Sequence, residues 1–262
     1  MNKHILFAII VSLLLTPSAL GGAIKVVATT TVLEDMVEQV GGDLVEVDSI
    51  VSSGVCPGHW DLKPSQVNSI AQADVIVQHG MESWVANQVS EDQMLVKLPG
   101  VWNTPQMAIE KVQKINEILK EIDPENGDIY DQRTQWVVGE MEELAANLTQ
   151  RAEDVNANEI EVLCMEWQND FVSWMGFNVT LTYGSEETLS IKDVNELINV
   201  GKEKDVTLVI SNLQSGVDFG DQMAEEVGAA HVILTNFPGA VENTDALYDM
   251  ILYNGNQLIN AV

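Results

Sequence analysis

The chain has 262 residues, of which 46% are hydrophobic, so it is long enough to bury a core in one large domain or two smaller ones. Forty acidic residues against twelve basic ones give a formal net charge of −28, which makes nucleic acid and anionic membrane surfaces poor partners. The acidic residues are spread along the chain, and this pattern favours a halophilic protein, because salt screens the repulsion between them.

Residues 1–23 have the pattern of a secretory signal peptide. Lys3 gives a basic start, the apolar run from Ile5 to Leu15 follows, and Pro17 precedes a row of small residues suited to cleavage. The apolar run is shorter than the roughly 20 residues that a membrane-spanning helix needs. We therefore expect an extracytoplasmic protein, with an uncleaved N-terminal membrane anchor as the alternative.

From residue 24 to residue 104, β-branched strands alternate with segments of helical period. Strands are expected at 24–30, 44–51, 75–79 and 94–98, and helices at 31–40 and 65–73, the second capped by Ser65. Strands that alternate with helices predict a parallel sheet with helices on both faces. This part of the chain is thus expected to form an N-terminal α/β lobe.

The alternation stops between residues 105 and 157. A helix is expected from Pro105 to about Ile122, and the sequence Asp-Pro-Glu-Asn-Gly at 123–127 ends it. A longer helix with an apolar stripe is expected from Ile129 to about Val155. These helices are expected to connect two lobes.

Strands and helices alternate again from residue 158 to residue 262. Strands are expected at 159–165, 178–182, 206–211 and 230–235, and helices before Trp174 and at 191–204, 219–227 and 244–261. The predicted fold class is α/β, with two similar lobes of mostly parallel sheet joined by one long helix. A ligand is expected in the cleft between the lobes, beyond the carboxyl ends of the strands.

Several motifs occur in an order that carries a resemblance over essentially the whole mature chain. They are GVCPGHWDLKPS at 54–65, AQADVIV at 71–77, Trp102-x-x-Pro105 before a helix, and DPEN at 123–126 before the long helix. This order resembles the zinc- and manganese-binding substrate-binding proteins of ABC transporters, the cluster A-I family. The resemblance implies a cation between the lobes, held mostly by histidines and a carboxylate. It also implies delivery to an ABC permease in the membrane by a monomeric protein.

The chain departs from the family at the positions where the resemblance implies ligands. Gly58 stands at the first family histidine, with His59 one residue late, and Gly100 stands at the second. Cys164 or Met165 stands at the third. The family's acidic ligands fall near two amides, Asn212 and Asn236. The resemblance therefore supports the scaffold and not the usual zinc site.

The residues themselves suggest a different ligand set. Cys56 and His59 follow the second strand of the first lobe, while Cys164, Met165 and Glu166 close the first strand of the second lobe. Thiolate, imidazole and thioether are soft to borderline donors. They predict a metal ion, with zinc favoured by the resemblance and copper or nickel as further possibilities.

An alternative interpretation joins Cys56 and Cys164 in a disulfide, as two cysteines of an exported chain often are. The cleft would then hold a metal chelate or a neutral organic molecule between tryptophans and amides. The remaining residues expected to line the cleft are Trp60, His79, Trp102, Gln168, Asn212, Gln214 and Asn236.

No set of residues in the sequence predicts catalysis. The chain lacks a Gly-x-Ser-x-Gly motif and a glycine-rich phosphate loop. Cys164 and His59 would come from different lobes, and nothing in the sequence orients the histidine as a base. We therefore expect a binding protein and not an enzyme.

Overall fold

The computed structural model describes residues 22–262, apart from the side chain of His59. The expected signal peptide falls almost entirely on residues 1–21, which lie outside the described residues. No helix in the described part of the chain combines the length and the apolar character that crossing a membrane requires.

The described chain forms two four-stranded sheets, and every strand pair in both is parallel. The first sheet has the order β2-β1-β3-β4 and the second the order β6-β5-β7-β8. The strands of the first sheet are β1 (Ile24–Thr30), β2 (Val45–Val51), β3 (Val75–Gln78) and β4 (Met94–Lys97). Those of the second are β5 (Glu161–Met165), β6 (Asn178–Tyr183), β7 (Leu208–Asn212) and β8 (Ala230–Leu234).

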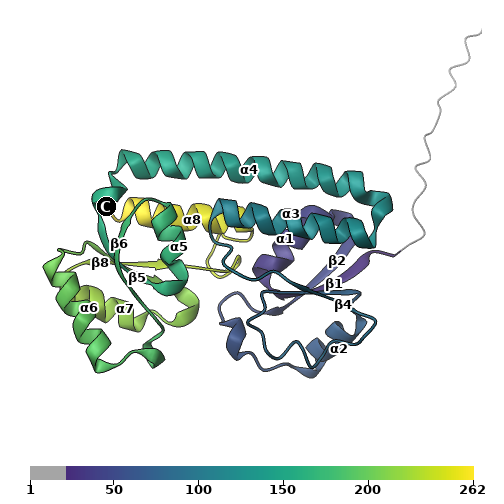
Figure 1. The fold of residues 1–262 in the computed structure, drawn as a ribbon, viewed down its shortest axis with the longest axis horizontal. Helices are drawn as coiled ribbons and strands as arrows, with labels where there is room; N and C mark the ends of the chain where they lie inside the picture. Colours follow the sequence, from purple (N-terminus) through teal and green to yellow (C-terminus); the bar gives the residue numbers. More distant parts are fainter. Residues whose placement is uncertain (1–21) are drawn as a thin grey trace, which may run out of the picture.

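Helices cover both faces of each sheet (Figure 1), as expected for a parallel sheet in which the strand order runs in both directions from a central strand. The helices are α1 (Thr31–Gly41), α2 (Pro64–Gln72), α3 (Pro105–Ile122), α4 (Gly127–Asp154), α5 (Asn169–Trp174), α6 (Ile191–Glu203), α7 (Asp218–Val227) and α8 (Leu247–Asn260). Each central strand is buried on both faces, which explains why β1 and β5 read as nearly continuous apolar runs.

Helix α4 runs along one side of the molecule and passes over both lobes (Figure 1). It packs on α3 and α1 at one end and on α8 toward the other. One continuous apolar core lies beneath it and includes side chains from both sheets, such as Val26 of β1, Leu144 of α4 and Ile210 of β7. Separate smaller cores lie under α2 in the first lobe and under α6 and α7 in the second.

The predicted fold class is confirmed, with two α/β lobes, parallel sheets and a long helix between them. Most expected elements lie within one or two residues of their observed positions. One local detail differs: α2 begins at Pro64 with Lys63 as its N-cap, and Ser65 lies inside its first turn. Proline at the first helical position is favoured because its missing N–H has no partner there in any case.

Candidate functional site

The carboxyl ends of the two sheets face each other across a small cavity of about 30 Å³, which we call the inter-lobe pocket. The first lobe contributes Cys56, Pro57, Met81 and Trp102. The second lobe contributes Trp167, Asn212, Gln214, Ser215, Asn236 and Phe237. A space of this size holds an ion or one or two waters, whereas organic ligands occupy cavities of about 300–1,000 Å³. In this conformation the pocket does not suit the organic ligand of the alternative interpretation.

The turn that carries Cys56 follows β2 and leads into a short 3-10 helix, Pro57–His59. The Pro57 carbonyl accepts a hydrogen bond of 3.0 Å from Trp84 Nε1. Trp84 lies in the segment after β3, so this bond joins the two loops that follow β2 and β3. The Cys56 side chain is partly exposed and lines the pocket.

The turn after β3, residues 79–82, is organised by a buried carboxylate. Glu82 Oε1 accepts from Thr29 Oγ1 at 2.6 Å and from the His79 N–H at 3.1 Å, and Oε2 accepts from the Gly80 N–H at 2.7 Å. Gly80 has φ = 103°, which favours glycine. The turn directs Met81 to the pocket, and the residue is 37% exposed.

Trp102 links the lobes and forms one wall of the pocket. Its Nε1 donates to the Asn236 carbonyl at 2.7 Å, and its ring stacks on His79 at 3.9 Å and on Phe237 at 5.6 Å between centroids. His79 therefore lies behind the tryptophan and does not line the pocket. Burial, together with the nearby charge of Lys111, lowers the pKa of His79 to about 3. Its imidazole is neutral at physiological pH.

Amides of the second lobe form a buried cluster beside the pocket. Gln168 is fully buried, and its Nε2 donates to Asn212 Oδ1 at 3.0 Å and to Asn236 Oδ1 at 2.9 Å. Asn212 Nδ2 donates in turn to Ser215 Oγ at 2.8 Å. These bonds join the carboxyl ends of β5, β7 and β8 into one polar layer.

Gln214 extends this layer to the first lobe. Its Nε2 donates to the Ser53 carbonyl at 2.8 Å and to Thr235 Oγ1 at 2.9 Å. Its Oε1 accepts from the Asn236 N–H at 3.1 Å. The loops after β2, β7 and β8 are therefore held together by a single amide.

The three expected ligands Cys56, His59 and Cys164 do not all meet in the pocket. Cys56 lines it, and the side chain of His59 lies outside the described parts. Cys164 is completely buried and belongs to the core beneath α4, together with Phe171 of α5. Burial raises the pKa of its thiol. The structure therefore gives no support to Cys164 as a ligand.

The alternative disulfide is wrong, because Cys56 and Cys164 are both free thiols. Strand alternation explains the misplacement of Cys164: the β5 side chains Val162 and Cys164 face one core, and Leu163 and Met165 face the other.

The other residues expected near the cleft have separate positions. Met165 is buried, its Sδ accepts from the Trp167 N–H at 3.3 Å, and it lines a second small cavity beside Tyr183. Glu166 is exposed. Trp60 packs on the small core under α2 and donates to Gln66 Oε1 at 3.1 Å.

Five of the lining residues were not in the predicted set: Pro57, Met81, Trp167, Ser215 and Phe237. All five lie in the segments that follow strands β2, β3, β5, β7 and β8. The rule that ligands bind beyond the carboxyl ends of parallel strands could have selected them. Within the described residues, no group of three or more His, Cys, Asp and Glu side chains is placed to hold a metal ion.

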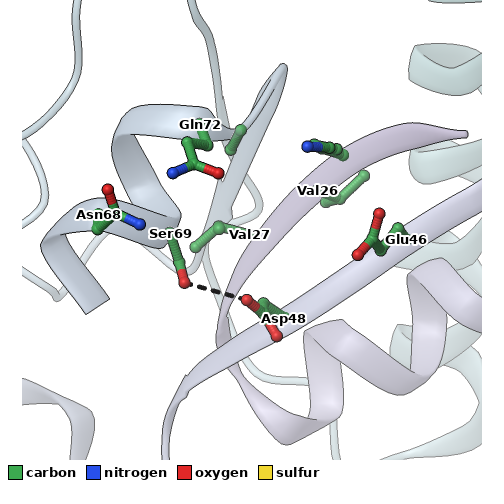
Figure 2. Close-up of a pocket in the computed structure, with 9 residues that line it drawn as sticks. Val26, Val27, Glu46, Asp48, Asn68, Ser69 and Gln72 are labelled. Atoms are coloured by element: carbon green, nitrogen blue, oxygen red, sulfur yellow. Dashed lines mark hydrogen bonds between the residues drawn. The ribbon is translucent and has the colours of Figure 1, made fainter. Parts of the chain in front are cut away.

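Two other cavities lie away from the inter-lobe pocket. One, of about 100 Å³, lies in the first lobe between β2 and α2, where Ser69 Oγ donates to Asp48 at 3.1 Å (Figure 2). The other, of about 660 Å³, lies between the end of β4 and α3, and its charged lining residues are Lys97, Lys111, Lys114, Glu110 and Asp170. The lysines outnumber the acidic residues there, which disfavours a cation, and the first cavity involves one lobe alone.

Comparisons with known proteins agree with this architecture. The family model described as "Zinc-uptake complex component A periplasmic" matches residues 26–261. The iron-binding protein YfeA of Yersinia pestis is 22% identical over 241 residues, which are 82% of this chain and 78% of that protein. The manganese-binding lipoprotein MntA of Halalkalibacterium halodurans is 24% identical over 144 residues, 47% of this chain and 48% of that one.

Solved structures share the fold at low sequence identity. The Mn-bound periplasmic metal binding protein from Candidatus Liberibacter asiaticus superposes with a TM-score of 0.80 at 15% identity, covering 90% of this chain and 98% of that one. A crystal structure of ZnuA superposes with a TM-score of 0.74 at 20% identity, covering 90% and 99%.

Proposed function

The chain belongs to the family of the periplasmic component A of zinc-uptake complexes, and from that premise we propose that it carries its metal ion in the inter-lobe pocket, with Cys56 as a ligand. Members of this family are substrate-binding proteins of ABC importers and not enzymes, and this chain is a metal-binding member. The observation that carries the proposed site is the position of Cys56. Its thiol stands where the loops of both sheets converge.

The proposed cargo is zinc or a softer ion, with copper and nickel as the softer candidates. A cysteine thiolate binds such ions better than it binds manganese, magnesium or calcium. His59 follows Cys56 after two residues, and it is proposed as a second ligand from the same turn. The relatives named above for iron and manganese do not decide between these ions, because the ligand positions of this chain differ.

The proposed partner is an ABC permease that receives the ion at the membrane. Relatives of the chain are periplasmic proteins and lipoproteins. We propose that this protein is likewise extracytoplasmic, that residues 1–23 direct its export or keep it at the membrane, and that it works as a monomer. A net charge of −28 spread over the sequence supports the further proposal that it is halophilic.

Metal analysis of the reduced, purified protein tests the site. After loading with Zn²⁺ and removal of excess metal, we expect about one ion per chain. Cys56→Ser should lose the ion, whereas Cys164→Ala, which alters the other thiol in the core, should keep it. Circular dichroism checks that both variants fold. Retention of the ion by Cys56→Ser would refute the proposed site.

A further inference from the structure

We propose that the cargo is a monovalent soft cation of the Cu(I) class, held by the sulfur atoms of Cys56 and Met81. This inference rests on the proposed function, since it assumes that an ion occupies the inter-lobe pocket. It goes beyond it by naming the charge and the ligand preference of the ion. It also assigns a role to Met81, which the sequence analysis did not include.

The described side chains that line the pocket supply fewer donors than a zinc or manganese site usually has, and the donors they do supply favour a soft ion. Zinc sites use about four ligands from Cys, His and carboxylate, and manganese prefers oxygen and imidazole. Among the described side chains that line the pocket there is no carboxylate and no imidazole. What the lining does offer is one thiol, one thioether and several amides.

The oxygens of the three amides that line the pocket each already accept a hydrogen bond. Asn212 Oδ1 and Asn236 Oδ1 each accept a hydrogen bond from the buried Gln168 amide, and Gln214 Oε1 accepts from a backbone N–H. These bonds keep the carbonyl oxygens within the polar layer of the second lobe. The sulfur atoms of Cys56 and Met81 remain as the strongest donors for a metal, and both are soft ligands that select Cu(I).

The two sulfur-bearing residues are held on neighbouring turns. Glu82 fixes the turn of Met81 by accepting three hydrogen bonds, two of them from backbone N–H groups. Trp84 follows in the same segment and donates to the Pro57 carbonyl, directly after Cys56. The first lobe therefore presents a thiol and a thioether from two loops that are bonded to each other.

Charge balance also favours a monovalent ion. When an ion binds, the Cys56 thiol releases its proton to solvent and contributes one negative charge. A monovalent cation with this thiolate and a neutral thioether gives a neutral complex. A divalent cation would leave one unbalanced positive charge in a pocket walled by Trp102, Trp167 and Phe237, and uncompensated charges in such surroundings are costly.

The size of the pocket and its aromatic walls agree with a dehydrated ion. A volume of about 30 Å³ leaves no room for a full hydration shell. Trp102 and Trp167 come from opposite lobes and wall the pocket with apolar ring surface. Closure of the lobes around the ion would thus replace water with sulfur and aromatic carbon.

Competition titrations under anaerobic, reducing conditions test the proposal. Cu(I) is titrated against bicinchoninate into the wild type, Cys56→Ser, Met81→Leu and the control Met107→Leu, a methionine on α3 that lines the lysine cavity. We expect about one Cu(I) per chain, complete loss in Cys56→Ser, and weakening by about tenfold or more in Met81→Leu. Met107→Leu should bind as the wild type does.

Parallel titrations with Zn²⁺ and Mn²⁺ separate the two proposals. If Zn²⁺ binds through Cys56 and Met81→Leu leaves the affinity for every metal unchanged, the proposed function stands and the sulfur-pair inference fails. If none of the three ions binds, both fail. Extended X-ray absorption fine structure at the copper edge counts the sulfur atoms bound to copper. Sulfur ligands in the wild type, with one fewer in Met81→Leu, would support the inference directly.

Discussion

Asp35 of α1 joins the two lobes through a bond to the first residue of α8. Its Oδ2 accepts from the Leu247 N–H at 2.9 Å, and its Oδ1 accepts from Gln39 Nε2 at 3.4 Å. Burial raises the pKa of Asp35 from 3.8 to about 6, with smaller upward contributions from the charges of Glu38 and Asp249. The two hydrogen bonds oppose this rise, and burial exceeds them.

The raised pKa makes the ionised carboxylate a source of instability. Between about pH 4 and pH 6 the folded protein keeps a proton that the unfolded chain has already lost, so the contribution of Asp35 to stability falls as the pH rises. One pKa unit corresponds to about 1.4 kcal/mol, so the rise from 3.8 to about 6 corresponds to about 3 kcal/mol above pH 6. Asp35→Asn removes the charge, and its amide oxygen can still accept from the Leu247 N–H.

We expect Asp35→Asn to match the wild type near pH 4 and to exceed it by about 2–3 kcal/mol near pH 7.5. Urea unfolding at several pH values measures the free energy of unfolding, and the difference between variant and wild type cancels the titration of the other acidic residues. Glu142→Gln on α4 is the control, because Glu142 is exposed and is not among the charges that raise the pKa of Asp35, and it should change little. A difference curve for Asp35→Asn that stays flat with pH would refute the reasoning.

Three further predictions follow from other parts of the molecule. A Cβ at Gly220 would lie 1.9 Å from Ser211 Oγ, so Gly220→Ala should destabilise the protein by about 1–3 kcal/mol in urea unfolding. In the control Gly139→Ala on α4 the added Cβ meets no atom within 4 Å, so this variant should be as stable as the wild type or more stable. Equal losses of unfolding free energy in both variants would contradict this account. Titration with a thiol reagent should modify Cys56 in the folded protein and Cys164 only after denaturation, because Cys164 is fully buried. Rapid modification of both thiols in the folded protein would show that Cys164 does not lie in the core. Raising KCl from about 0.1 M to about 1 M should raise the melting temperature. The salt shortens the Debye length from about 10 Å to about 3 Å and so screens the repulsion within a chain of net charge −28. A flat or falling melting temperature would argue against salt adaptation.

The fold was largely accessible from local pattern. The strand Ile24–Thr30 and the helix Pro105–Ile122 were predicted with the observed bounds, because β-branched runs and a proline at the first helical position are strong local signals. The side chain of Ser190 caps α6 by accepting from the Asp193 N–H, which is another local contact. Such features depend on residues close together in the sequence, so the local sequence is enough to predict them.

The site was accessible only in part. The sequence placed Cys164 and Met165 at the end of a strand but could not say which of them faces which side, since successive side chains alternate. Met81 was overlooked because methionine in a sequence is read as core filler. Its position at the pocket depends on Glu82, whose partner Thr29 lies 53 residues earlier. Contacts of this range follow from tertiary packing and not from local pattern.

The absence of carboxylates from the described lining of the inter-lobe pocket has a consequence for selectivity against abundant ions. A chain with forty acidic residues, most of them solvent-accessible, gathers an atmosphere of hard cations such as Na⁺ and Mg²⁺, which bind oxygen ligands. The described lining gives these ions no charged oxygen to bind. If the proposed soft ion is the cargo, the hard ions around the surface do not compete with it for the pocket, whatever their concentration.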